Sequence, residues 1–267
     1  MRSRQMLYWA GAATSLLLVC WQVSDAHDLK VFASRQRLLQ PGKTVVYLSW
    51  GHSLPVDELI SGETIQAYEL YCPGGNLTKL PIRELDFQQC EIQCERPGIY
   101  QVGVMRKPAV FTYVFDESGR RVLRRGGKQE NTSAKVDYAM RSYQFAKAII
   151  VCGEGHEAPG PLEHALELLP LNAAKDWRTG SLLRLQLRFR GRPLAGEMVT
   201  ATHLGHHPQD AWCFAKETDR EGLVDVPCST PGTWVFRARY RQPAPERERS
   251  VFDYEMFTAT LSLEIGR

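Results

Sequence analysis

The chain has 267 residues, of which 43% are hydrophobic and 24% are charged. These proportions are typical of a globular protein, and they exclude a mainly disordered or collagen-like chain. The formal net charge is only +3 and the basic residues are spread along the sequence, which argues against nucleic-acid binding.

The first 26 residues have the pattern of an export signal. Arg2 and Arg4 precede an apolar run over residues 6–20, and the small residues Ser24 and Ala26 occupy the positions that signal peptidase reads. We therefore expect cleavage after Ala26, a periplasmic location, and His27 as the first residue of the mature protein. An uncleaved membrane anchor is the alternative, but the apolar run is short for a membrane span.

Short segments rich in β-branched and aromatic residues follow, each bounded by Gly or Pro. Up to residue 151 they cover 44–50, 67–72, 100–104, 109–115 and 143–151. This spacing is typical of an all-β protein.

A hydrophilic stretch from 116 to 134 interrupts the strand pattern. It contains a basic cluster made of Arg120, Arg121, Arg124, Arg125 and Lys128. Such a cluster in a Gly-containing loop indicates a solvated turn, and the alternative is docking to an acidic partner or a membrane surface.

The second half of the chain has a clearer period of two. Apolar residues alternate with polar ones over 183–189, 234–240 and 257–265, which predicts strands with one buried face. A turn-rich linker, 153–161, separates the halves. We predict two immunoglobulin-like β-sandwich domains, at 27–155 and 156–267, after a signal peptide at 1–26.

Six cysteines remain after cleavage: Cys72, Cys90, Cys94, Cys152, Cys213 and Cys228. An even number in an exported chain indicates disulfides, and a thiolate metal site is the alternative. We expect a Cys213–Cys228 disulfide because these residues flank a predicted hairpin. Cys90 and Cys94 have two alternatives, a local bridge or pairing of one of them with Cys72.

Histidine is the residue type that points to chemistry, because imidazole is a good ligand for nickel, cobalt, copper and zinc. The candidate metal ligands are His27, His52, His156, His203, His206 and His207. His203, His206 and His207 form the densest cluster, after a predicted strand at 198–202. A polar loop that happens to be histidine-rich is the alternative. His164 is expected to be an ordinary exposed histidine.

His27 and His52 are expected to meet. His27 opens the first strand and His52 closes a neighbouring one, so an antiparallel pairing places both at one rim of the sandwich. As the first mature residue, His27 also offers a free α-amine. Asp28 and Asp57 are the nearest carboxylates in sequence, and His156 could close the site between the domains.

Enzymatic motifs are missing from the sequence. It contains no Gly-x-Ser-x-Gly elbow, no His-Glu-x-x-His, no phosphate-binding glycine loop and no dinucleotide fingerprint. We therefore expect a protein that is not an enzyme and has no catalytic residues and no cofactor beyond a transported ion.

The chain resembles a known family in several short pieces. These pieces are Ala26-His27-Asp28, Trp50-Gly51-His52, Pro97-Gly98, Pro231-Gly232 and the turn over 218–222. They are similar to the NikM-like periplasmic family, described as a periplasmic component of cobalt or nickel transport. This resemblance implies Ni²⁺ or Co²⁺ as the transported ligand and a membrane permease or outer-membrane receptor as the partner.

Two functional hypotheses follow. The first is a periplasmic nickel- or cobalt-binding accessory protein of a metal uptake system. The second is an exported structural or adhesion β-sandwich module with no metal ligand. Metal analysis of the mature protein distinguishes them.

Overall fold

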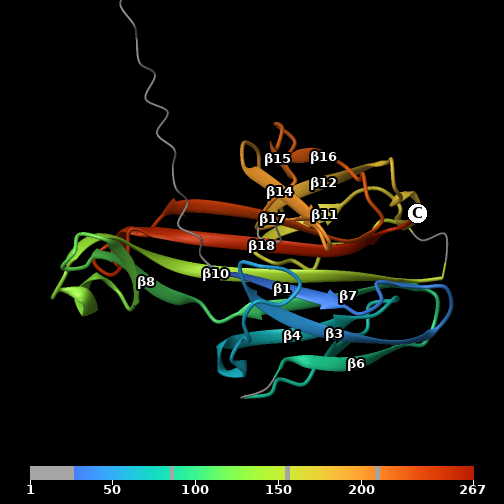
Figure 1. Ribbon diagram of the computed structural model, residues 1–267, viewed down its shortest axis with the longest axis horizontal. Coiled ribbons are helices and arrows are strands. Elements are labelled where there is room, and N and C mark those ends of the chain that lie inside the picture. Colours follow the sequence, from blue (N-terminus) through green and yellow to red (C-terminus); the bar gives the residue numbers. More distant parts are fainter. Residues whose placement is uncertain (1–26, 85–86, 154–156, 208–210) are drawn as a thin grey trace, which may run out of the picture.

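A computed structural model describes residues 27–84, 87–153, 157–207 and 211–267 (Figure 1). This part of the chain consists of short and long β-strands with a few 3-10 turns and no α-helix. The strands are β1 (Asp28–Ala33), β2 (Arg37–Leu38), β3 (Gly42–Gly51), β4 (Ile65–Tyr71), β5 (Leu77–Lys79), β6 (Gln89–Cys94), β7 (Gly98–Arg106), β8 (Ala109–Phe115), β9 (Arg121–Arg125), β10 (Lys135–Cys152), β11 (Leu166–Pro170), β12 (Leu182–Phe189), β13 (Arg192–Pro193), β14 (Met198–His203), β15 (Phe214–Glu217), β16 (Leu223–Pro227), β17 (Gly232–Pro243) and β18 (Tyr254–Ile265). The 3-10 turns are Gly62–Thr64, Lys128–Asn131, Ala174–Asp176 and Glu246–Glu248.

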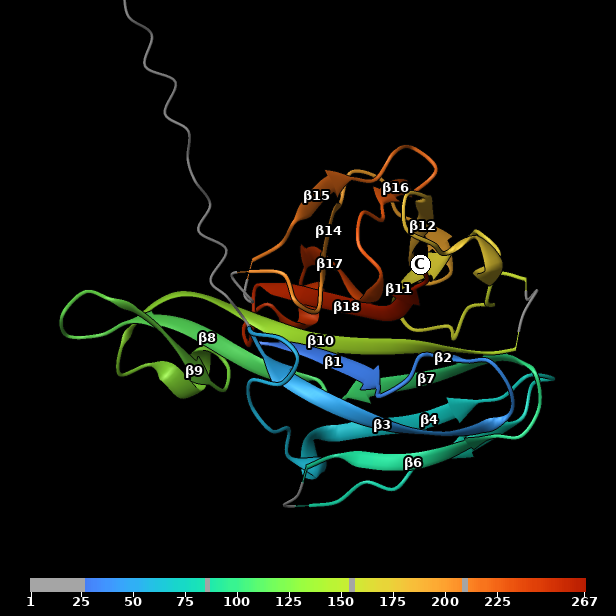
Figure 2. The same ribbon diagram turned by 45° about the vertical axis from the view of Figure 1, so that its right-hand side comes forward.

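The strands of the described residues form three sheets. The largest runs in the order β15-β14-β17-β18-β10-β7-β4-β5; β2 and β8 also pair with β10, and β9 pairs with β8. A small sheet, β1-β3-β6, packs against its β4, β7 and β10 part, and another, β11-β12-β13 with β16, packs against its β14, β17 and β18 part. Figures 1 and 2 show the two small sheets on opposite sides of the long strands β10 and β18.

Strand β10 contributes to two hydrophobic cores. Because successive side chains of a strand point to opposite faces, Phe145, Ile149 and Val151 enter the core shared with β17 and β18, whereas Ala148 and Ile150 enter the core shared with β1, β3 and β7. One continuous sheet therefore carries a separate core on each face.

Strand β1 lies across the polar face of β18. The hydroxyls of Thr260 and Ser262 donate to the backbone oxygens of Leu29 and Val31 at 2.6 Å each. All six residues of β1 are buried, including Asp28 and Lys30. Strand β1 is thus fixed on β18, the last strand of the described residues.

The all-β class and the sandwich packing are confirmed. The basic cluster was expected to form a solvated turn, but residues 121–125 form strand β9, which pairs with β8 along Phe111–Phe115. Its side chains are largely exposed, so it shows no buried face in the sequence pattern. The domain boundary predicted at 155 and 156 falls in residues 154–156, outside the described residues, and stays a prediction.

Candidate metal centre

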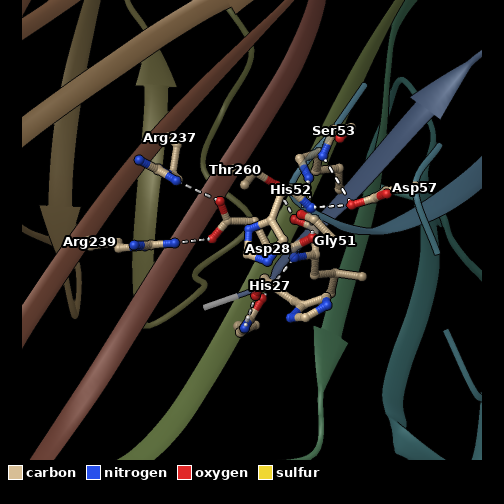
Figure 3. Close-up of polar contacts among 12 residues, drawn as sticks. His27, Asp28, Gly51, His52, Ser53, Asp57, Arg237, Arg239 and Thr260 are labelled. Atoms are coloured by element: carbon tan, nitrogen blue, oxygen red, sulfur yellow. Dashed lines mark hydrogen bonds and ion pairs between the residues drawn. The ribbon is translucent and has the colours of Figure 1, made fainter. Parts of the chain in front are cut away.

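His27 and His52 meet at one edge of the small sheet β1-β3-β6. Strands β1 and β3 are antiparallel with Asp28 opposite Gly51, so the residue before β1 and the residue after β3 lie side by side. The two imidazole ring centroids are 4.5 Å apart (Figure 3). The indole of Trp50 also stacks on His27, with 5.6 Å between ring centroids. The structure therefore brings these two predicted site residues together.

Glu58 is the carboxylate at this edge. A β-bridge sets Trp50 opposite Glu58, and one carboxylate oxygen of Glu58 lies 2.8 Å from Nε2 of His27. Sequence reasoning missed Glu58 and named Asp28 and Asp57 instead. The turn over 51–57 brings Glu58 back beside Trp50. The residue types do not show how many residues this turn contains, so they do not identify Glu58.

Asp57 has a structural role in the turn. Its carboxylate accepts hydrogen bonds from the backbone N–H groups of His52 at 2.7 Å and Ser53 at 3.2 Å. These bonds lower the pKa of Asp57 below its ordinary value. The carboxylate thus holds the turn that presents His52.

Asp28 is buried and faces two arginines (Figure 3). Its carboxylate oxygens lie 2.8 Å from Arg237 and 2.8 Å from Arg239, both on β17. Burial raises the pKa of Asp28, but attraction to Arg239 and Arg237 outweighs that effect, and the pKa lies below its ordinary value. This carboxylate therefore binds β1 to β17, and its oxygens are held by the two arginines.

Two further side chains fix the backbone of the site. Gln144 of β10 accepts from Leu29 N–H at 2.7 Å and donates to the carbonyl of His27 at 2.8 Å. Lys30 donates to the carbonyl of Gly51 at 2.6 Å, and burial lowers the pKa of Lys30 to about 8. The hydrogen bonds of Gln144 and Lys30 therefore fix the backbone next to both histidines.

Cationic and anionic side chains both surround the histidine pair. Lys30, Arg237 and Arg239 are cationic, whereas Asp28, Asp57 and Glu58 are anionic. Arg106 is a fourth cation, with its guanidinium 4.4 Å from the centroid of the Trp50 ring. Glu58 is the anion in direct contact with His27, and Arg237 and Arg239 bind Asp28.

Gly51 is the residue that allows His52 and Asp57 to approach. Its φ is +121°, and a Cβ atom there would overlap the Asp57 carboxylate. We expect Gly51→Ala to lower the free energy of unfolding by about 2 kcal/mol through backbone strain and loss of the Asp57 turn. Urea unfolding measures the change.

Gly75→Ala is the matched control. Gly75 also has a positive φ, +89°, but a Cβ there meets nothing within 4 Å. Gly75→Ala should therefore lower the free energy of unfolding through backbone strain alone, by about 1 kcal/mol. Equal losses of stability in the two variants would contradict the role given to Asp57.

The remaining predicted ligands divide into two groups. His203 and His206 lie together with Cys213: one donor atom from each falls within 4.8 Å of the other two. His207 is exposed and outside this group. His156 lies outside the described residues.

His164 differs from its expected exposure. It is buried against Phe145, with ring centroids 5.4 Å apart, and burial lowers its pKa to about 4. It therefore stays neutral at physiological pH and is a core residue.

The expected Cys213–Cys228 disulfide is not formed: both cysteines are free. The hairpin that suggested it is absent from the described strands, because β15 pairs with β14 whereas β16 pairs with β12 in another sheet. Cys213 is exposed at the start of β15, whereas Cys228 is buried in the core. In the same part of the chain, no disulfide joins Cys72, Cys90 and Cys94.

Comparison with known proteins gives one family. The sequence model of a domain of unknown function, DUF4198, matches residues 24–242. No curated protein matches the chain. Within the described residues no helix has the length and apolar character needed to cross a membrane.

Solved structures show only remote likeness. The D0-D1 domain of intimin is 10% identical over 91% of this chain and 100% of that chain, with a TM-score of 0.23. Two fibronectin type-III domains of chicken tenascin are 10% identical over 88% of this chain and 97% of that one, with a TM-score of 0.22.

Proposed function

The chain belongs to the DUF4198 family, a domain of unknown function, and from the geometry of His27 and His52 we propose that it is an exported, transition-metal-binding accessory protein. The observation that carries the proposal is the 4.5 Å approach of the His27 and His52 rings. The ion is cargo: Ni²⁺ or Co²⁺, the metals that the family resemblance implies, presented to a membrane permease or an outer-membrane receptor.

The third ligand in this proposal is the α-amine of His27. Cleavage after Ala26 would free it, and its ordinary pKa of about 8 allows it to lose a proton near neutral pH. Amine and imidazole of one residue can then bind the same ion. His52 adds a second imidazole. The Glu58 carboxylate, 2.8 Å from Nε2 of His27, would orient that ring and leave Nδ1 for the ion.

Nitrogen ligands of this kind suit late first-row divalent ions. Affinity for such sites rises from cobalt through nickel to copper, so selection of nickel or cobalt would depend on supply as well as on the site. Because the amine and both imidazoles must be neutral to bind, affinity is expected to fall as the pH is lowered.

The experiment is a calorimetric Ni²⁺ titration of the mature chain that begins at His27. It uses a His203→Ala, His206→Ala background, so that the imidazoles beside Cys213 do not obscure the result. One variant carries an acetyl group on the α-amine of His27, which keeps the imidazole but removes the amine from chelation. We expect this variant to bind Ni²⁺ about 100-fold more weakly.

His27→Ala and His52→Ala are expected to weaken binding by at least about tenfold, since each removes a ligand. His207→Ala is the control, because it removes an exposed histidine that is not one of the proposed ligands. If the parent chain binds Ni²⁺, Co²⁺ and Cu²⁺ no better than its His27→Ala variant, the metal-uptake proposal fails. The structural or adhesion module without a metal ligand is then the better hypothesis.

A further inference from the structure

A second cluster of metal-ligand side chains lies at the turn after β14. His203 is the last residue of β14, and Cys213 directly precedes β15, its antiparallel neighbour. The backbone N–H of Cys213 donates to the carbonyl of Ala201 at 3.0 Å, which fixes Cys213 beside the end of β14. Residues ten apart in sequence are therefore held together by strand pairing.

A tight turn adds His206 to the pair. The N–H of His206 donates to the carbonyl of His203 at 3.0 Å, and Gly205 takes a φ of +94° within the turn. Such a φ favours glycine. The imidazole ring centroids of His203 and His206 are 5.6 Å apart. One ligand atom from each of His203, His206 and Cys213 lies within 4.8 Å of the other two.

The tautomer of His203 is suited to binding an ion. Its Nδ1 lies 3.1 Å from the carbonyl oxygen of Leu204, and a carbonyl oxygen can only accept. In the neutral ring Nδ1 therefore carries the proton, and Nε2 keeps its lone pair. The ring also packs against Trp234, with centroids 5.2 Å apart, which limits its rotation.

From these contacts we propose that His203, His206 and Cys213 form a second cation site, for a thiophilic d¹⁰ ion such as Zn²⁺ or Cu⁺. Two imidazoles and one thiolate are a common ligand set for such ions. A tetrahedral ion would need donors about 3.5 Å apart, so modest side-chain rotation closes the site. On binding, the Cys213 thiol releases one proton to solvent.

The site differs in chemistry from the His27–His52 pair. It contains a sulfur ligand, and the other has nitrogen and oxygen alone. Soft ligands select soft ions, so the two sites would hold different metals. The second site does not depend on cleavage after Ala26 or on the proposed transport role.

The test measures alkylation of Cys213 with and without Zn²⁺ in the full mature chain carrying His27→Ala and His52→Ala. Cys213 is the exposed cysteine of the described part of the chain, so peptide mapping can follow it separately from the others. We expect stoichiometric Zn²⁺ to slow its alkylation about tenfold, because the bound thiolate is withheld from the reagent. Co²⁺ should give a thiolate charge-transfer absorption band.

Cys213→Ser should abolish the Co²⁺ band, and His206→Ala should weaken Zn²⁺ binding about tenfold. His207→Ala, next to the site but not in it, should change neither result. Unchanged alkylation with Zn²⁺, a Co²⁺ band that survives Cys213→Ser, or Cys213 found in a disulfide in the exported protein would each overturn the proposal. Since His27 and His52 are already removed, failure here leaves the first site untouched.

Discussion

Asp28→Asn is expected to lower the free energy of unfolding by about 3 kcal/mol or more, because it removes the negative charge that faces two arginines in a buried position. Asp28 is 3% exposed and lies 2.8 Å from both Arg237 and Arg239. Asparagine keeps the shape and removes the charge. Chemical denaturation of the mature protein at pH 7 measures the difference.

The control is Asp137→Asn, which removes a carboxylate that lies 3.5 Å from Arg121 and is 33% exposed. Partly exposed pairs of this kind contribute less than about 1 kcal/mol. A similar loss of unfolding free energy in both variants would contradict the large contribution given to the pairing of Asp28 with the two arginines.

The pH dependence gives a second measurement on Asp28. Its folded-state pKa is lowered, so its stabilising contribution is present above the unfolded pKa of about 3.9 and is lost as the pH falls through the folded value. The stability gap between the parent and Asp28→Asn should therefore be constant near neutral pH and shrink below about pH 4. Burial of His164 destabilises both proteins alike between pH 6.5 and about 4, so it cancels in the difference.

Lys147→Met is expected to lower the free energy of unfolding by about 3–5 kcal/mol, because it leaves the carboxylate of Glu167 buried without its cation. The ammonium of Lys147 lies 2.6 Å from Glu167, and their side chains are 2% and 4% exposed. Burial lowers the pKa of Lys147, and attraction to Glu167 offsets part of that effect. The same carboxylate accepts from Leu162 N–H at 2.8 Å.

A double-mutant cycle tests this pair. Lys147→Met with Glu167→Gln should cost much less than the sum of the two single changes, with a coupling energy above about 2 kcal/mol. Lys43 and Glu91 are the matched pair, since they have the same 2.6 Å separation but are 62% and 56% exposed. Their coupling should stay below about 1 kcal/mol. Equal coupling in both pairs would contradict the importance given to burial.

The sequence predicted the part of the site that depends on strand pairing. The expected cleavage site marked the start of β1 and Gly51 marked the end of β3. The expected antiparallel pairing of these strands places His27 beside His52. Glu58 was missed because its position depends on how the turn over 51–57 closes, which is set by Asp57 accepting two backbone N–H groups. That contact leaves no mark in composition or periodicity.

Other errors share one physical cause: the sequence shows residue types but does not show which sheet a strand joins. Asp28 looks like a surface carboxylate until β1 is placed between β3 and the face of β18. Cys213 and Cys228 look like hairpin neighbours until β15 and β16 enter different sheets. Sheet membership depends on contacts between residues far apart in sequence, and local patterns do not contain them.

The hydrogen bonds that the hydroxyls of β18 donate to β1 also bear on the order in which contacts form during folding. Thr260 and Leu29 are 231 residues apart, as are Ser262 and Val31. Strand β3 and Gln144 of β10 precede β18 in the chain and can hold β1 first, because β1 pairs with β3 and Gln144 bonds the backbone of His27 and Leu29. The contacts with Thr260 and Ser262 join residues much farther apart in sequence, and such distant contacts form slowly. We therefore expect the β18 contacts to be the last that the backbone of β1 makes.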